Sequence, residues 1–186
     1  MIKNLIQQGS IITLIHFLHN YKELDEKKER YTYDPMYQPC AHYGNRFQAQ
    51  PTWETEELNK IDLHMFESIK DQIQKLFTEK ITKFKCRIRL TLTSELKKSV
   101  QFKNNHMGFV HHDTTQFAGI IPFDQSFEGG TAFFENEWDR VPDIVYGSWP
   151  NRLILYNAQR NHAACHDFTF EKRYCLLIFF NLNETT

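Results

Sequence analysis

Residues 84–93 read Phe-Lys-Cys-Arg-Ile-Arg-Leu-Thr-Leu-Thr, so apolar and polar side chains alternate along the whole stretch. Because successive side chains of a β-strand point to opposite faces, the alternation predicts a strand that is buried on one face only. The polar face, with Lys85, Arg87, Arg89 and Thr91, could look either to solvent or into a polar cavity. The stretch therefore predicts a sheet and leaves the surroundings of its polar face open.

Residues 173–181 indicate a second strand with a different burial pattern. Arg173, Cys175, Leu177 and Phe179 share one face, and the residues between them, which form the other face, are also apolar. A strand with two apolar faces is typical of the middle of a sheet, so we expect this strand to be central. Further strands are predicted near 107–113, 116–123, 130–135 and 152–157, between Gly, Asn, Asp and Pro residues.

The first half of the chain favours helices. Apolar residues at steps of three and four predict a long amphipathic helix over about 54–80, and Ser10 is a candidate cap for a shorter helix over 11–18. Helices followed by many short strands indicate a mainly β fold with supporting helices, with a double-stranded β-helix, or jelly roll, as its core. We expect a single domain over 1–186, with residues 1–82 as helical and aromatic-rich support and residues 83–182 as the jelly-roll catalytic core.

Composition narrows the class of protein. The 186 residues are 41% hydrophobic and carry a formal net charge of −1, which gives no general attraction to nucleic acid or to anionic membranes. We expect neither as a partner. The apolar stretch 11–18 is too short to span a bilayer, and the four cysteines show no C-x-x-C spacing. Reduced thiols and a cytoplasmic location are therefore expected, with disulfides as the alternative that an even number of cysteines allows.

The segment after Val110 carries the candidate chemistry. His111 and Asp113 are two residues apart, so in a strand both side chains project to one face while His112 projects to the other. An H-x-D pair alone is more often a surface pair than a metal site. Together with His162 it supplies two imidazoles and one carboxylate, which is the ligand set of a non-haem iron site. His166 is the alternative to His162.

Arg173 begins the predicted central strand and has apolar neighbours on its own face. A guanidinium in such surroundings is costly to bury unless an anion pairs with it. A dicarboxylate would provide that anion, whereas an exposed first position in the strand would need none.

These motifs together resemble the iron(II)/2-oxoglutarate-dependent dioxygenases, particularly their small prolyl-hydroxylase-like branch. The resemblance covers roughly residues 84–182. It rests on His111-x-Asp113, the tight turn Gly129-Gly130-Thr131, the strand 151–157, then His162 and Arg173.

The resemblance implies that His111, Asp113 and His162 hold Fe(II) and that Arg173 pairs with 2-oxoglutarate. Tyr156 is a weaker candidate for contact with this co-substrate. With O2 as the second co-substrate, the implied activity is hydroxylation of an unactivated C–H bond of a peptidyl or small-molecule substrate, with release of succinate and CO2. The alternative is a jelly-roll metalloprotein with a hydrolytic or purely binding role, which would give Arg173 no obvious anion.

The segment from Tyr31 to Trp53 is rich in aromatic residues and is interrupted by Pro and Gly. It could form a mobile lid over the mouth of the barrel or a static cover on the core. Trp138, Arg140 and Trp149 lie in a long connection that could also border the site.

Overall fold

The computed structural model describes residues 2–38, 50–98, 107–108, 110–139 and 141–183. Strands exceed helices in these residues, as the sequence predicts. In chain order the elements are α1 (Ile2–Gln7), β1 (Ile12–Leu14), α2 (Tyr21–Lys27), the 3-10 helix η1 (Lys28–Arg30), β2 (Asp34–Gln38), β3 (Gln50–Glu54), α3 (Leu58–Ile61), α4 (Leu63–Gln74), β4 (Ile81–Leu92), α5 (Thr93–Leu96), β5 (Phe117–Pro122), β6 (Ser126–Phe133), β7 (Ile144–Ser148), β8 (Leu153–Asn157), β9 (His162–Cys165) and β10 (Lys172–Leu182).

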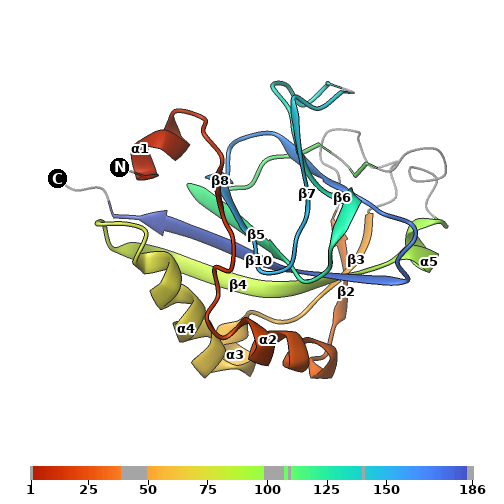
Figure 1. Ribbon diagram of the computed structural model, residues 1–186, viewed down its shortest axis with the longest axis horizontal. Helices are drawn as coiled ribbons and strands as arrows, with labels where there is room; N and C mark the ends of the chain where they lie inside the picture. The colour runs from red at the N-terminus through yellow and green to blue at the C-terminus, as the bar shows by residue number, and fades with distance from the viewer. Residues whose placement is uncertain (1, 39–49, 99–106, 109, 140, 184–186) are drawn as a thin grey trace.

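The strands form two antiparallel sheets. The larger sheet has the order β1-β8-β5-β10-β4-β3-β2, and the smaller one has the order β7-β6-β9. The hairpin of β6 and β7 lies on one side of the long strands β4 and β10, and helices α2, α3 and α4 lie on the other side (Figure 1). The predicted mainly β jelly-roll core with supporting helices is confirmed.

Strand β10 is central in the larger sheet, as its two apolar faces predict. It pairs along its length with β4, from Lys172↔Leu92 to Leu182↔Ile81, and on its other edge with β5. Leu176 and Ile178 on one face are completely buried in the main core cluster. The core therefore fills the space between β10 and the helices.

The helix expected over 54–80 is present as two shorter helices. Met65, Ile69 and Ile73 of α4 are fully buried, as the apolar periodicity predicts, whereas Ile61 is 40% exposed. The break lies at Asp62, whose extended backbone ends α3 and whose carboxylate accepts a hydrogen bond from the Met65 amide at 3.1 Å. Asp62 is thus the N-cap of α4.

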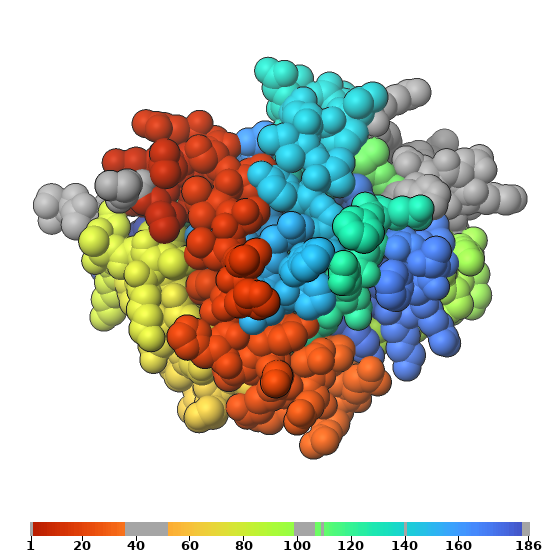
Figure 2. Space-filling view, viewed as in Figure 1, coloured from red at the N-terminus to blue at the C-terminus, as the bar shows by residue number. Residues whose placement is uncertain are grey.

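The prediction of a helix over 11–18 capped by Ser10 is wrong. The helix lies earlier, over Ile2–Gln7, and ends at Gly9, which has a φ of 93°. Residues 12–14 instead extend the larger sheet by pairing with β8, so the β-branched Ile12 and Thr13 lie in an edge strand. Figure 2 shows this N-terminal segment, red to orange, running over the visible face from α1 to α2.

The prediction of a continuous strand near 107–113 is also wrong. Within its described residues, only the isolated bridges Met107↔Cys165 and His111↔His162 are formed. Strand β7, β9 and the hairpin of β2 and β3 were not predicted, because each is short and lacks clear alternation. Part of the Tyr31–Trp53 segment, residues 39–49, lies outside the described residues, so the lid remains a prediction.

In the part of the chain that the structure describes, every helix is too short or too polar to cross a lipid bilayer.

Replacing Asp62 by Ala should lower the free energy of unfolding by about 1–2 kcal/mol, because α4 loses its N-cap. Asn caps helices as well as Asp does, so Asp62→Asn should lower the free energy of unfolding less than Asp62→Ala does. The loss in Asp62→Asn should reflect only the missing ion pair with Lys27 Nζ, which lies 2.8 Å from the Asp62 carboxylate. Urea unfolding at neutral pH measures both values. An Ala variant as stable as the wild type would contradict this role of Asp62.

The charge of Asp62 also predicts a pH dependence. Burial alone would raise the pKa of Asp62, but hydrogen bonds from Lys27, Met65 and Tyr31 hold that pKa below its usual value. A lowered pKa in the folded state stabilises the protein above the unfolded-state pKa, and this contribution is lost as the pH falls through the lowered value. The stability gap between wild type and Asp62→Asn should therefore close in acid.

Candidate metal centre

A backbone bridge brings the two predicted histidine ligands together. The His111 amide donates to the His162 carbonyl at 2.9 Å, and the His162 amide donates to the His111 carbonyl at 2.8 Å. Residues that exchange both hydrogen bonds lie directly opposite each other with side chains on the same side, and here the two ring centroids are 4.4 Å apart. Asp113, two residues further on, is fixed by donation from its amide to the Ala158 carbonyl at 2.8 Å.

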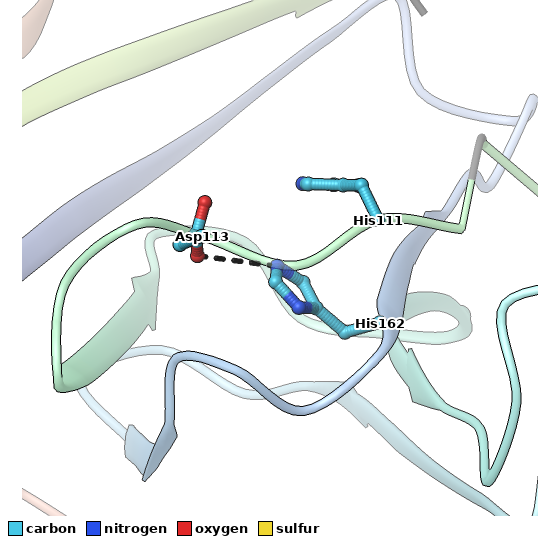
Figure 3. Close-up of side chains that lie close together, drawn as sticks. All are labelled: His111, Asp113 and His162. Atoms are coloured by element: carbon cyan, nitrogen blue, oxygen red, sulfur yellow. Dashed lines mark ion pairs between the residues drawn. The ribbon is translucent and has the colours of Figure 1, made fainter. Parts of the chain in front are cut away.

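The three side chains converge on one point. The ligand atoms of His111, Asp113 and His162 all lie within 4.8 Å of one another. Figure 3 shows the three pointing toward a common space, with His111 and Asp113 coming from one segment and His162 from β9. The structure therefore assembles the two imidazoles and the carboxylate that the sequence singles out.

Hydrogen bonding fixes the protonation of His162. Its Nδ1 lies 2.9 Å from the Arg160 carbonyl oxygen, which can only accept, so Nδ1 carries the proton and donates it. The lone pair is then on Nε2, which faces the site. Burial, followed by the effect of His111, lowers the pKa of His162 to about 3, so the ring is neutral at physiological pH.

The carboxylate of Asp113 faces this lone pair. Asp113 Oδ2 is 3.5 Å from His162 Nε2, and no hydrogen bond to Oδ2 is formed by the described residues. Burial raises the pKa of Asp113, although His111, Arg89 and Arg87 oppose the shift. Two buried acceptors that face each other without a donor between them are unfavourable alone, and a cation between them would relieve this.

Arg173 lies in the same pocket as the three side chains. The pocket is lined by all five predicted site residues, His111, Asp113, Tyr156, His162 and Arg173, together with residues of β4, β6 and β10. The Arg173 guanidinium donates to the Cys165 carbonyl at 3.0 Å and to the Ser148 hydroxyl. Two of its five N–H groups are thus used to hold it in place, and its Nε has no hydrogen-bond partner among the described residues.

Gly129 makes room for this guanidinium. A Cβ atom at position 129 would overlap the Arg173 side chain. Gly129 and Gly130 lie inside β6, where the pairing with β7 shifts register after Ser126, so the tight turn expected before the strand is instead an irregularity within it. The glycine at 129 is explained by the close approach of Arg173.

Tyr156 forms part of the wall of the pocket. It is almost fully buried on β8, its ring centroid lies 5.0 Å from that of His162, and burial raises the pKa of its hydroxyl well above the usual value. The side chain therefore stays a neutral phenol. His162 also contacts Phe133, so the neutral imidazole is held between aromatic rings.

Of the other candidate residues, some line the pocket and others do not. His112 is exposed, whereas His166 is 4% exposed and lines the pocket, so it stays an alternative ligand. Trp138 and Trp149 are exposed at 64% and 41% and are not in the pocket lining. Arg140 lies outside the described residues.

Sequence reasoning did not assign Arg89, Thr91 and Ser148 to the site, although all three line the pocket. For Arg89 and Thr91 the alternation of residues 84–93 supplied the signal, because it placed them on a polar face that could look into a cavity. In the structure, Arg89 and Thr91 face the cavity. Ser148 lies in a strand that no pattern indicated.

Substituting His111, Asp113 or His162 by Ala should weaken iron(II) binding by at least about 100-fold, because each removes one of few ligands. His112→Ala is the matched control and should bind normally, since its side chain is exposed. Metal content after anaerobic loading gives the answer. Loss of metal in His166→Ala with retention in His162→Ala would transfer the ligand role to His166.

Gly129→Ala should displace the Arg173 guanidinium without touching the three converging side chains. We expect 2-oxoglutarate binding to weaken by about tenfold or more, while iron(II) binding is unchanged. Ser148→Ala removes only one hydrogen-bond partner of Arg173 and should have a smaller effect. Calorimetric titration of the two variants tests this order, and full 2-oxoglutarate affinity in Gly129→Ala would contradict it.

Comparisons with known proteins place the fold. Neither a protein-family model nor a curated protein matches the sequence. Among solved structures, a Trichoplax adhaerens prolyl hydroxylase in complex with a hypoxia inducible factor peptide fragment has a TM-score of 0.64 at 12% identity, with 97% of this chain and 87% of that chain covered.

Two further structures are similar. An oxidoreductase of the 2OG-Fe(II) oxygenase family from Burkholderia pseudomallei has a TM-score of 0.61 at 12% identity, covering 96% of this chain and 88% of that chain. A non-heme alpha ketoglutarate dependent epimerase from nogalamycin biosynthesis has a TM-score of 0.60 at 11% identity, covering 96% and 80%. The chain thus has the fold of the 2-oxoglutarate- and iron(II)-dependent oxygenases.

Proposed function

We propose that this protein is an iron(II)- and 2-oxoglutarate-dependent oxygenase that hydroxylates an unactivated C–H bond of a peptidyl or small-molecule substrate. One observation carries the proposal: the ligand atoms of His111, Asp113 and His162 lie within 4.8 Å of one another, in the pocket that also contains Arg173. The shared fold of solved oxygenases supports it.

The donor set fits iron(II). Two neutral imidazoles and one carboxylate are the ligands that non-haem iron oxygenases use, and three ligands leave further positions for co-substrates. The Nε2 lone pair of His162 and the partnerless Oδ2 of Asp113 face each other, which a divalent cation would stabilise. The donation from His162 Nδ1 to the Arg160 carbonyl holds the ring in the orientation that a ligand needs.

The surroundings of Arg173 fit a dicarboxylate. The guanidinium is fixed by Cys165 and Ser148 and retains unused N–H groups, which suit a bidentate contact with a carboxylate. A hydrolytic metalloprotein could use the same three ligands, but it would give the unused N–H groups of the partly buried Arg173 no anion in the pocket. Arg173 therefore favours the oxygenase.

When bound, iron(II) and 2-oxoglutarate would supply the oxidation of the substrate by O2, with succinate and CO2 as co-products. The protein supplies position and exclusion of water. His111, Asp113 and His162 would hold the metal, and Arg173 would orient the co-substrate. Tyr156 and Phe133, both nearly fully buried, form an apolar wall beside His162 that keeps water from this side.

Anaerobic addition of iron(II) and 2-oxoglutarate should produce a metal-to-ligand charge-transfer absorption band, because the co-substrate would chelate the metal. Iron(II) alone should not produce it. Zinc(II) binding without such a band in the iron-loaded protein would favour the hydrolytic alternative. Absence of metal binding would leave only a non-catalytic binding role.

Arg173→Leu should weaken 2-oxoglutarate binding by about 2–5 kcal/mol, the usual scale for removal of one partner from a buried charge pair. Iron(II) binding should persist, since Arg173 is not among the three converging side chains. Lys at this position should restore binding only in part, because it lacks the planar fork. Titration of the charge-transfer band measures the affinities, and an unchanged value in Arg173→Leu would exclude the residue from the co-substrate site.

A further inference from the structure

A second pocket adjoins the metal-site pocket at its outer side. It is lined by Glu57, Lys85, Arg87, Asp113, Thr114, Thr115 and Phe179. Asp113 and Phe179 also line the metal-site pocket, so the two spaces meet at the proposed metal ligand. A molecule in the outer pocket would therefore lie against two side chains that also border the site of the proposed reaction.

The polar face of β4 connects the two pockets. Arg89 is opposite Cys175 of β10 and lines the metal-site pocket, and Arg87 is opposite Leu177 and lines the outer pocket. Because alternate residues of a strand share a face, the two guanidiniums lie on the same side of the sheet at successive positions along β4.

A single buried carboxylate holds both arginines. Glu54, at the end of β3, has a side chain that is 1% exposed, and its Oε1 accepts from Arg89 Nε at 2.8 Å and meets Arg89 Nη2 at 2.6 Å. Its Oε2 forms an ion pair with Arg87 Nε at 2.7 Å, although the two atoms do not have hydrogen-bond geometry. One negative charge therefore faces two positive charges.

Arg87 is held at its inner end only. Its Nε faces Glu54, and its Cζ lies 5.7 Å from the centroid of the Phe179 ring, within the range of a cation–π contact. Among the described residues, Glu54 is the ion-pair partner of Arg87, and neither Nη group of Arg87 forms a hydrogen bond. The side chain is 30% exposed, so these two groups are left to a ligand in the outer pocket.

Cationic side chains outnumber anionic ones in the lining of the two pockets. Arg87, Arg89, Arg173 and Lys85 line them against Asp113 and Glu57, and Glu54 lies behind. Lys85 is already paired with Glu57 at 3.3 Å. Asp124 and Asp167 lie close enough to Arg173 for its charge to act on their pKa values, so Arg87 is the cation of the outer pocket that is considered for binding an anion.

We propose that the substrate carries a carboxylate that binds the two Nη groups of Arg87, with the rest of the molecule extending past Phe179 toward Asp113. A carboxylate matches the planar fork of two parallel N–H groups, and its negative charge suits the guanidinium. This inference rests on the proposed function for the reaction, but the anion site itself is built by Glu54, Arg87 and Phe179.

The test is a set of small probes in three groups. The first is N-acetyl amino acids, which have a free α-carboxylate. The second is the N-acetyl N-methylamides of Asp and Glu, which have only a side-chain carboxylate, as inside a peptide. The third is N-acetyl N-methylamides of neutral amino acids, which have no charge. Binding is measured by saturation-transfer NMR to the zinc(II)- and 2-oxoglutarate-loaded protein and to the metal-free protein.

At least one carboxylate group should bind about tenfold or more tightly than the neutral group, and Arg87→Gln should abolish the preference. Arg87→Lys should restore part of it. Lys70→Gln is the matched control. Lys70 on α4 pairs with Glu67 and lies over the Phe66 ring, so its removal breaks a similar set of contacts away from the pocket. The carboxylate preference should be unchanged in this variant. The group that binds distinguishes a free carboxylic acid from an acidic peptide side chain.

No preference for carboxylates, no binding by any group, or a preference that survives Arg87→Gln would each overturn the inference. Arg89 still pairs with Glu54 in Arg87→Gln, so the fold should persist, and retained 2-oxoglutarate binding by this variant verifies that. A carboxylate preference lost in Arg173→Leu but kept in Arg87→Gln would mean that the probes occupy the co-substrate site. Failure of the charge-transfer test would refute the oxygenase and leave binding at Arg87 in the metal-free protein as a separate result.

Discussion

The pairing of β4 with β10 determines both the core and the site. The two strands run antiparallel over most of their length, and each sends alternate side chains to opposite faces of the sheet. On one face Ile88, Leu176 and Ile178 form the core with α4, and on the other Arg89 and Arg173 line the pocket. A slip of one residue would exchange the faces and bury guanidiniums in the core, which makes this register strongly specified.

The polar pocket is stable inside the barrel because its charged side chains form short ion pairs and hydrogen bonds with groups beside them. Glu54 neutralises part of the charge of Arg87 and Arg89, and backbone and hydroxyl oxygens hold Arg173. Buried charges without such partners would cost several kcal/mol each. Asp113 Oδ2 and Arg173 Nε, which have no hydrogen-bond partner among the described residues, lie where a metal and an anion are proposed to bind.

The sequence predicts most of the central architecture because alternation and helical periodicity are local signals. They identify β4, the central position of β10 and the buried face of α4, and the H-x-D spacing places His111 and Asp113 on one side. They do not identify β1, because Ile11 to Leu18 suit a helix as well as a strand, and pairing with β8 decides between them. They also do not reveal Glu54, whose role depends on β3 lying beside β4, a contact between segments distant in sequence. Ser148 escapes prediction for the same reason.

The segment of His111 is joined to the barrel by main-chain hydrogen bonds of Gly108, His111 and Asp113, and the Gln159 side chain donates to the Asp113 carbonyl. A metal held by side chains from this segment and from β9 would act as a cross-link between them. A metal that binds only when the two segments lie together stabilises that arrangement against local opening by mass action. Iron occupancy would therefore set how often this edge of the barrel opens, and amide exchange at residues 110–113 would report the iron supply of the cell.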